Sequence, residues 1–65
     1  MTYELTIFDG HAEAGTTTIE AVDLQEAEAR AEAWTQEGDW DHEGIVEVRI
    51  ECDGEMSHIE VLVGD

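Results

Sequence analysis

The chain has 65 residues, room for a single small domain over residues 1–65, and such a domain buries only about 60% of the surface that its unfolded chain exposes. Its 18 Asp and Glu residues and two arginines give a formal net charge of −16, which argues against direct binding to nucleic acid or to an anionic membrane surface. One cysteine, no signal-peptide pattern and no apolar run of the ~20 residues that a membrane span needs together predict a cytoplasmic protein.

The first two predicted elements are strands. Residues 2–8 alternate between apolar and polar side chains, which is typical of a strand with one buried face and places Glu4 on the other face. Residues 9–15 have a glycine near each end and predict a loop. Residues 16–22 are rich in β-branched side chains and predict a second strand, antiparallel to the first, with Glu20 pointing away from the core.

A helix is predicted next. Asp23 is a favourable N-cap residue, and Glu26 three residues later completes a capping-box pattern. Arg30 can pair with Glu26 at the i, i+4 spacing. Gly38 is the expected C′ residue, which ends the helix. Apolar side chains recur at helical spacing and form one stripe: Leu24, Ala27, Ala31 and Trp34.

The remainder of the chain predicts a β-hairpin. Residues 45–52 alternate between apolar and polar side chains, and residues 55–63 return as a fourth strand. The dipeptide Asp53-Gly54 between them is a strong signal for a two-residue turn, and it sets a register in which Glu47 lies opposite Glu60. Two carboxylates in direct cross-strand pairing destabilise a hairpin, and nothing in the sequence compensates this pair, so selection for stability alone would tend to remove it.

Together these elements predict an α+β fold of order ββαββ, in which one helix packs on the apolar face of a four-stranded, largely antiparallel sheet. The opposite face should meet water, and every strand contributes a carboxylate to it. These carboxylates are candidate partner-binding residues: Glu4, Glu20, Glu47, Glu51 and Glu60.

Residues 39–44, with the sequence DWDHEG, resemble the first half of an EF-hand calcium loop. Asp39, Asp41 and Glu43 would be ligands at positions 1, 3 and 5, ahead of a glycine at position 6. Position 12 requires a bidentate Glu, and Ile50 stands there, so the sequence predicts no EF-hand. Weak cation binding by residues 39–43 remains an alternative. Trp40 either folds over the sheet edge or serves as an exposed anchor in a binding site.

No other spacing indicates catalysis, a metal centre or a cofactor. His11, His42, His58 and Cys52 are scattered, without a zinc-ligand spacing. A general acid would need a sheltered pocket, for which one helix and one sheet leave little room. We therefore expect a protein that is not an enzyme and that has no cofactor.

The acidity itself has two interpretations. A halophilic accessory domain would be acidic and free of lysine for solubility. Alternatively, the carboxylates imitate nucleic-acid phosphates, since carboxylates two residues apart on a strand lie roughly 6.8 Å apart and neighbouring strands roughly 4.8 Å apart. Such a grid would bind the Lys and Arg side chains of a basic nucleic-acid-binding surface and would be weakened by salt. The expected contacts are the sheet carboxylates together with Asp39, Trp40, Asp41 and Glu43.

A small, acidic domain of one sheet and one helix resembles phage-encoded anti-CRISPR proteins and other DNA mimics. Residues 15–34, GTTTIEAVDLQEAEARAEAW, are similar to the strand-to-helix segment of some type I anti-CRISPR proteins, and the net charge is close to that of inhibitors of the type I-C and I-F complexes. The resemblance implies an inhibitor in the cytoplasm of a bacterial host. The sequence leaves its oligomeric state open, with a monomer favoured. Its target would be the basic surface that receives DNA in a type I surveillance (Cascade) complex.

Overall fold

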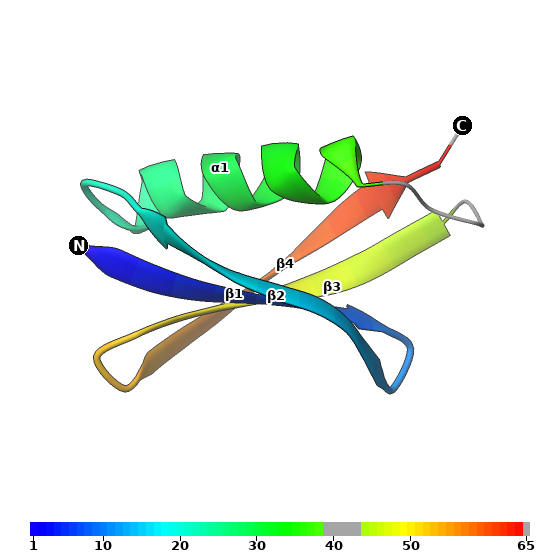
Figure 1. Ribbon diagram of the computed structural model, residues 1–65, viewed down its shortest axis with the longest axis horizontal. Coiled ribbons are helices and arrows are strands. Elements are labelled where there is room, and N and C mark those ends of the chain that lie inside the picture. The colour runs from blue at the N-terminus through cyan, green and yellow to red at the C-terminus, as the bar shows by residue number, and fades with distance from the viewer. Residues whose placement is uncertain (39–43, 65) are drawn as a thin grey trace.

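The structure, a computed structural model that describes residues 1–38 and 44–64, has the predicted ββαββ order (Figure 1). Its elements are β1 (Thr2–Asp9), β2 (Ala12–Glu20), α1 (Leu24–Glu37), β3 (Gly44–Cys52) and β4 (Glu55–Val63). The strands form one sheet in the order β2-β1-β3-β4, and all three pairings are antiparallel. The predicted α+β fold class is confirmed. Within the described residues, no helix combines the length and the apolar character needed to span a membrane.

β2 begins earlier than its side chains predict. The pairing with β1 continues as far as Asp9 and Ala12, so the predicted loop over residues 9–15 is wrong and the turn contains two residues. Gly10 has a φ of 68°, a left-handed conformation that glycine adopts without steric cost. Ala14 has no partner because the register shifts there, which is a β-bulge. Residues 12–15 have weak β propensity, but their backbone pairs with β1, a central strand, and they therefore form the start of β2.

The N-terminus of α1 is capped by Asp23, as the sequence predicts. The Glu26 N–H donates to Asp23 Oδ1 at 2.9 Å, and Glu26 Oε1 accepts from the Val22 N–H at 3.1 Å, one residue before the position expected for a capping box. Arg30 Nε also lies 3.5 Å from Glu26 Oε1. The helix ends at Gly38 as predicted; this residue has an ordinary φ of −67°, and its N–H donates to the Thr35 carbonyl at 3.2 Å.

The buried side of α1 is made of small side chains. Ala27, Ala31 and Thr35 recur every four residues and are fully buried, and the Thr35 hydroxyl donates to the Ala31 carbonyl at 2.7 Å. Trp34 is half-buried against the core. Leu24 was expected in the same stripe, but it is 43% exposed because it lies in the first turn, at the end of the helix. Small residues in the middle of the helix let it approach the sheet closely.

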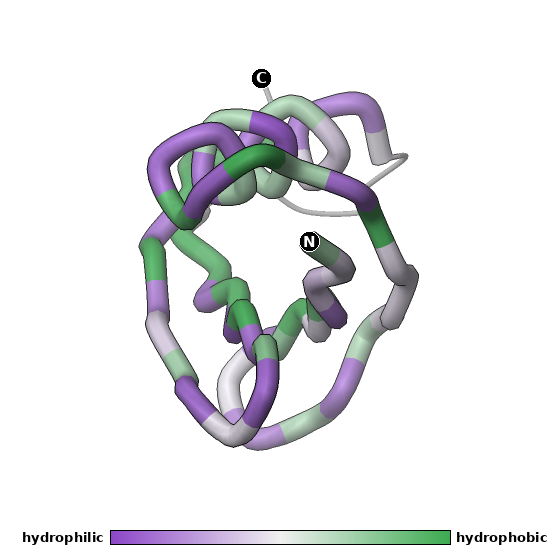
Figure 2. Tube along the Cα trace, turned by 90° about the vertical axis from the view of Figure 1, so that its left-hand side faces the viewer, coloured by the Kyte–Doolittle hydropathy of each residue, from purple (hydrophilic) through white to green (hydrophobic). Residues whose placement is uncertain are grey.

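The hydrophobic core lies between α1 and one face of the sheet. Seen end-on in Figure 2, the helix covers one side of a curved sheet, and hydrophobic and hydrophilic residues alternate along the strands. The helix packs mainly on β3 and β4, and no side chain of β2 is fully buried. The strand residues of the core are Tyr3, Leu5, Ile7, Val46, Val48, Ile50, Val61 and Val63.

Candidate functional site: the outer face of the sheet

The sheet face opposite α1, which we call the outer face, presents its side chains in rows that cross all four strands. The rows follow from the register of the three antiparallel pairings. From β2 to β4 they are Thr18, Glu4, Glu51 and Met56; Thr16, Thr6, Arg49 and His58; and Glu13, Phe8, Glu47 and Glu60.

Two of these rows contain carboxylates in direct cross-strand pairing. Glu47 lies opposite Glu60, which confirms the register predicted from the two-residue turn. Glu4 lies opposite Glu51, a second pair that exists because β1 and β3 are neighbours. All four residues are exposed. Side chains in such positions have Cβ atoms about 4.5–5.5 Å apart, so each pair repels and destabilises the sheet.

The middle row carries the basic side chains of the outer face. The Arg49 guanidinium lies over the Phe8 ring, 4.8 Å from its centroid, which is within the range of a cation–π contact. His58 lies opposite Arg49, and its Nε2 is 3.8 Å from Glu47 Oε1. When protonated, His58 offsets part of the repulsion between Glu47 and Glu60.

The spacing of the acidic rows differs from the predicted grid. On β3, Arg49 stands between Glu47 and Glu51, so these carboxylates are four residues apart, roughly 13–14 Å along an extended strand. None of the four described strands carries outer-face carboxylates only two residues apart. The predicted 6.8 Å repeat is therefore absent from them, and the two acidic rows are separated by a row that contains cations.

Two further carboxylates belong to the margin of the outer face near β2. Glu20 accepts a hydrogen bond of 2.7 Å from Thr2 Oγ1, and the N-terminal ammonium lies 3.9 Å from its other oxygen. Glu13 lies opposite Phe8 and faces outward. Sequence reasoning missed Glu13 because it placed residues 9–15 in a loop. The bulge at Ala14 puts Glu13 on the outer face, and the alternation pattern gives no sign of that bulge.

Exposed apolar side chains lie next to the Glu47–Glu60 row. Ile45 and Leu62 face each other across β3 and β4 and are 64% and 67% exposed. Sequence reasoning also missed this pair, although the alternation of β3 and β4 was sufficient to place it outward. The outer face therefore combines an apolar patch with repelling carboxylates at the same end of the hairpin.

The remaining predicted site residues lie outside the described part of the chain. They are Asp39, Trp40, Asp41 and Glu43. Across residues 1–38 and 44–64, no three His, Cys, Asp or Glu side chains come together in a group that could hold a metal ion.

Comparison with protein-family models, with curated proteins and with solved structures finds no match to this chain.

Proposed function

We propose that this protein is a non-enzymatic inhibitor whose outer face binds a basic nucleic-acid-binding surface. The target that we propose is the DNA-receiving surface of a type I CRISPR surveillance complex in the bacterial cytoplasm. The observation that carries the proposal is the presence of two exposed cross-strand carboxylate pairs, Glu4–Glu51 and Glu47–Glu60, on one face of a small domain.

The pairs support binding because they are unfavourable in the isolated protein. Each pair costs stability, and a single Thr or Lys at one of its positions would remove the repulsion. A Lys or Arg of a partner that inserts between two paired carboxylates contacts both of them, so the repulsion becomes attraction in the complex. Electrostatic complementarity of this kind also accelerates association and makes it sensitive to salt.

The arrangement of the rows supports mimicry of duplex DNA in particular. The row that contains Glu4 and Glu51 and the row that contains Glu47 and Glu60 are roughly 13–14 Å apart, on the scale of the ~12 Å width of the DNA major groove. Two rows of negative charge at that separation resemble phosphates on either side of a groove.

The apolar pair next to the second row supports a protein partner. Ile45 and Leu62 are more than half exposed and lie directly beside Glu47 and Glu60. Protein interfaces commonly combine a central apolar contact with a polar rim. Such a contact would add affinity that does not weaken with salt, so inhibition would decline with salt without disappearing at once.

The test is DNA binding by purified type I surveillance complexes, with and without the protein, across a salt series. We expect competitive loss of DNA binding that fades as salt rises. The double variant Glu47→Lys, Glu60→Lys should require a concentration at least about tenfold higher for the same inhibition, since charged interface contacts contribute a few kcal/mol. The matched control is Glu32→Lys, Glu37→Lys, which changes net charge equally on the exposed side of α1.

Each outcome of this test has a defined meaning. Full inhibition by the Glu47→Lys, Glu60→Lys variant would exclude the outer face as the contact. Equal loss in both double variants would show that total charge matters and position does not. No competition by the native protein at saturation would exclude this target.

A second candidate function follows from the acidity of the helix. Besides the sheet carboxylates, Glu32 and Glu37 on α1 are exposed and Glu28 is half-exposed, so negative charge covers both sides of the domain. A halophilic accessory domain needs no single acidic face and predicts this distribution. The salt dependence of folding, considered below, separates the two candidates.

A further inference from the structure

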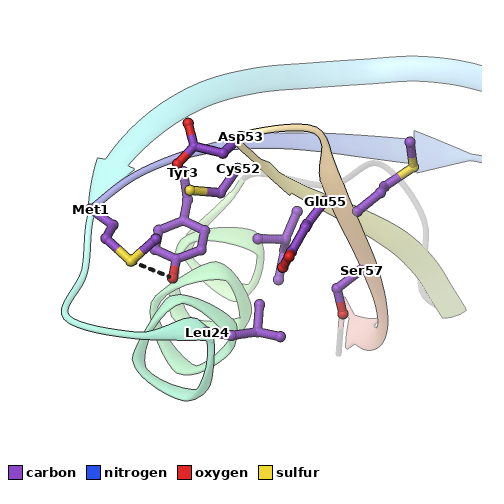
Figure 3. Close-up of a pocket in the computed structure, with 9 residues that line it drawn as sticks. Met1, Tyr3, Leu24, Cys52, Asp53, Glu55 and Ser57 are labelled. Atoms are coloured by element: carbon purple, nitrogen blue, oxygen red, sulfur yellow. Dashed lines mark hydrogen bonds between the residues drawn. The ribbon is translucent and has the colours of Figure 1, made fainter.

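A small pocket opens at the end of the sheet where the β3–β4 turn meets the starts of β1 and α1. Its volume is about 170 Å³. Figure 3 shows Met1 just before β1, Tyr3 on β1, Leu24 on α1, and Cys52 and Glu55 on either side of the turn. The floor lies on the helix-facing side of the sheet. Met56 is the one member of the outer-face rows that lines the pocket, and none of the carboxylates in those rows does.

The walls of the pocket are apolar and partly uncovered. Tyr3 and Ile50 are buried beneath it, and the Tyr3 hydroxyl donates to Met1 Sδ at 3.7 Å. Met1 and Leu24 at its margin are 61% and 43% exposed, although they are large apolar side chains. Exposed apolar side chains around a concave site mark a place where another molecule can be bound.

The mouth of the pocket is negatively charged. Asp53 and Glu55 line it; Figure 3 shows the Glu55 carboxylate pointing from the turn toward α1 and the Asp53 carboxylate farther away, beside Cys52. Burial raises the pKa of the Tyr3 hydroxyl, and the negative charges of Cys52, Asp23, Glu55 and Asp53 raise it further. Burial also raises the pKa of the Cys52 thiol, with Asp53 as the next cause.

The nearest positive charge is already engaged. The N-terminal ammonium donates to the Ala21 carbonyl at 2.8 Å and lies 3.9 Å from a Glu20 carboxylate oxygen. No Arg or His side chain of the described chain lines the pocket. A ligand with an apolar stem and a positive end would therefore complement it.

We propose that this pocket binds the side chain of a lysine presented by a partner protein. The methylene groups of the lysine would lie against Tyr3, Ile50 and Leu24, and its ammonium would lie at the mouth, beside the Glu55 carboxylate and attracted also by the charge of Asp53. Long cationic side chains bury an apolar stem while the charged end stays near water, which is the arrangement that this pocket offers.

The size of the pocket sets the class of ligand. A protein cavity of about 150 Å³ holds one benzene molecule, so about 170 Å³ accommodates roughly six non-hydrogen atoms. A lysine side chain has four methylene groups and one amine and fits that space. Pockets for drug-sized ligands and cofactors occupy about 300–1,000 Å³, so a nucleotide or a larger organic ligand does not fit.

The experiment is a titration of the intact protein with two blocked tripeptides, acetyl-Gly-Lys-Gly-amide and its norleucine analogue. NMR signals of the Leu24 and Met1 methyl groups report on the pocket. We expect saturable shifts with the lysine peptide at about millimolar concentration, as expected for about six contacting atoms at ~0.7 kcal/mol each. The norleucine peptide, which lacks the ammonium, should bind at least about fivefold more weakly.

A double variant separates charge from shape. Asp53→Asn with Glu55→Gln removes both carboxylates, and Asn is well tolerated at position 53, where the backbone has a φ of 51°. Binding of the lysine peptide to this variant should weaken at least about fivefold. The control Glu32→Gln, Glu37→Gln removes the same charge from exposed helix positions and should bind the peptide as the native protein does.

The outcomes are distinct from those of the inhibition test, because this proposal does not rest on the proposed function. Equal binding of the norleucine and lysine peptides would overturn the proposal by showing that the pocket is simply apolar. The absence of saturable shifts, or equal weakening in the control variant, would also overturn it.

Discussion

At the scale of single residues, Tyr3 and Cys52 combine burial with nearby negative charge. Tyr3 is 4% exposed, and Cys52 is half-buried. Burial raises the pKa of both groups above their ordinary values of 10.0 and 9.0, because an anion in either position would lose its hydration. The sequence placed both residues on the apolar face, but their titration depends on residues that only the fold brings near.

This predicts the reactivity of Cys52 toward iodoacetamide. The thiolate is the reactive form, so the native protein should react more slowly at pH 8 than the same protein unfolded in urea. The rate should still be rising above pH 9, because the pKa of the native thiol is raised. A rate profile that is the same with and without urea would contradict the assignment.

The same shifts set the direction of the pH dependence of stability. The folded state favours the protonated forms of Cys52 and Tyr3. Their contribution to the free energy of unfolding is therefore complete below pH 9.0, where the thiol of the unfolded protein is also protonated. It is lost as the pH rises above that value, because the unfolded protein then releases protons that the folded protein retains.

At the scale of elements, the β3–β4 hairpin was the most predictable part of the fold. Asp53 and Gly54 have φ angles of 51° and 83°. Both lie in the left-handed region, as the two central residues of a type I′ hairpin turn require. That local geometry sets the register of the whole hairpin, including the Glu47–Glu60 pair. The N-cap of α1 at Asp23 was equally predictable, because both ends of its hydrogen bond lie within four residues.

The Glu47–Glu60 pair predicts a stabilising substitution. Glu60→Lys replaces repulsion by attraction across β3 and β4 and should raise the free energy of unfolding in urea by about 0.5–1 kcal/mol. The control is Glu13→Lys, which changes net charge equally but lies opposite Phe8, not opposite a carboxylate. Equal stabilisation by both substitutions would show that the gain comes from net charge alone.

At the scale of the whole molecule, the net charge of −16 on 65 residues opposes compaction. The charge lies on the outer face and on α1, so repulsion acts around the domain as well as within each pair. Salt screens these exposed charges, and the screening length falls from about 10 Å at 0.1 M to about 3 Å at 1 M. Stability must therefore depend on ionic strength.

The form of that dependence distinguishes the two candidate functions. For an inhibitor that folds in an ordinary cytoplasm, we expect the thermal midpoint to rise with NaCl up to about 0.5 M and then to level off, as screening becomes complete. A domain that remains unfolded below molar salt would favour the halophilic function. Circular dichroism during heating at a series of salt concentrations measures this directly.

The sequence by itself determined the order of the elements, the helix cap, the hairpin register and the alternation that puts carboxylates on one face. Each of these depends on residues that are close in the chain or on a strand period of two. Only the tertiary structure decided that β1 lies beside β3, which creates the Glu4–Glu51 pair and places Arg49 over Phe8. It also decided that β2 extends back to Ala12 and that a pocket forms below the β3–β4 turn. The physical reason is that these features require contacts between segments distant in sequence, whose choice depends on which arrangement buries the most apolar surface against α1.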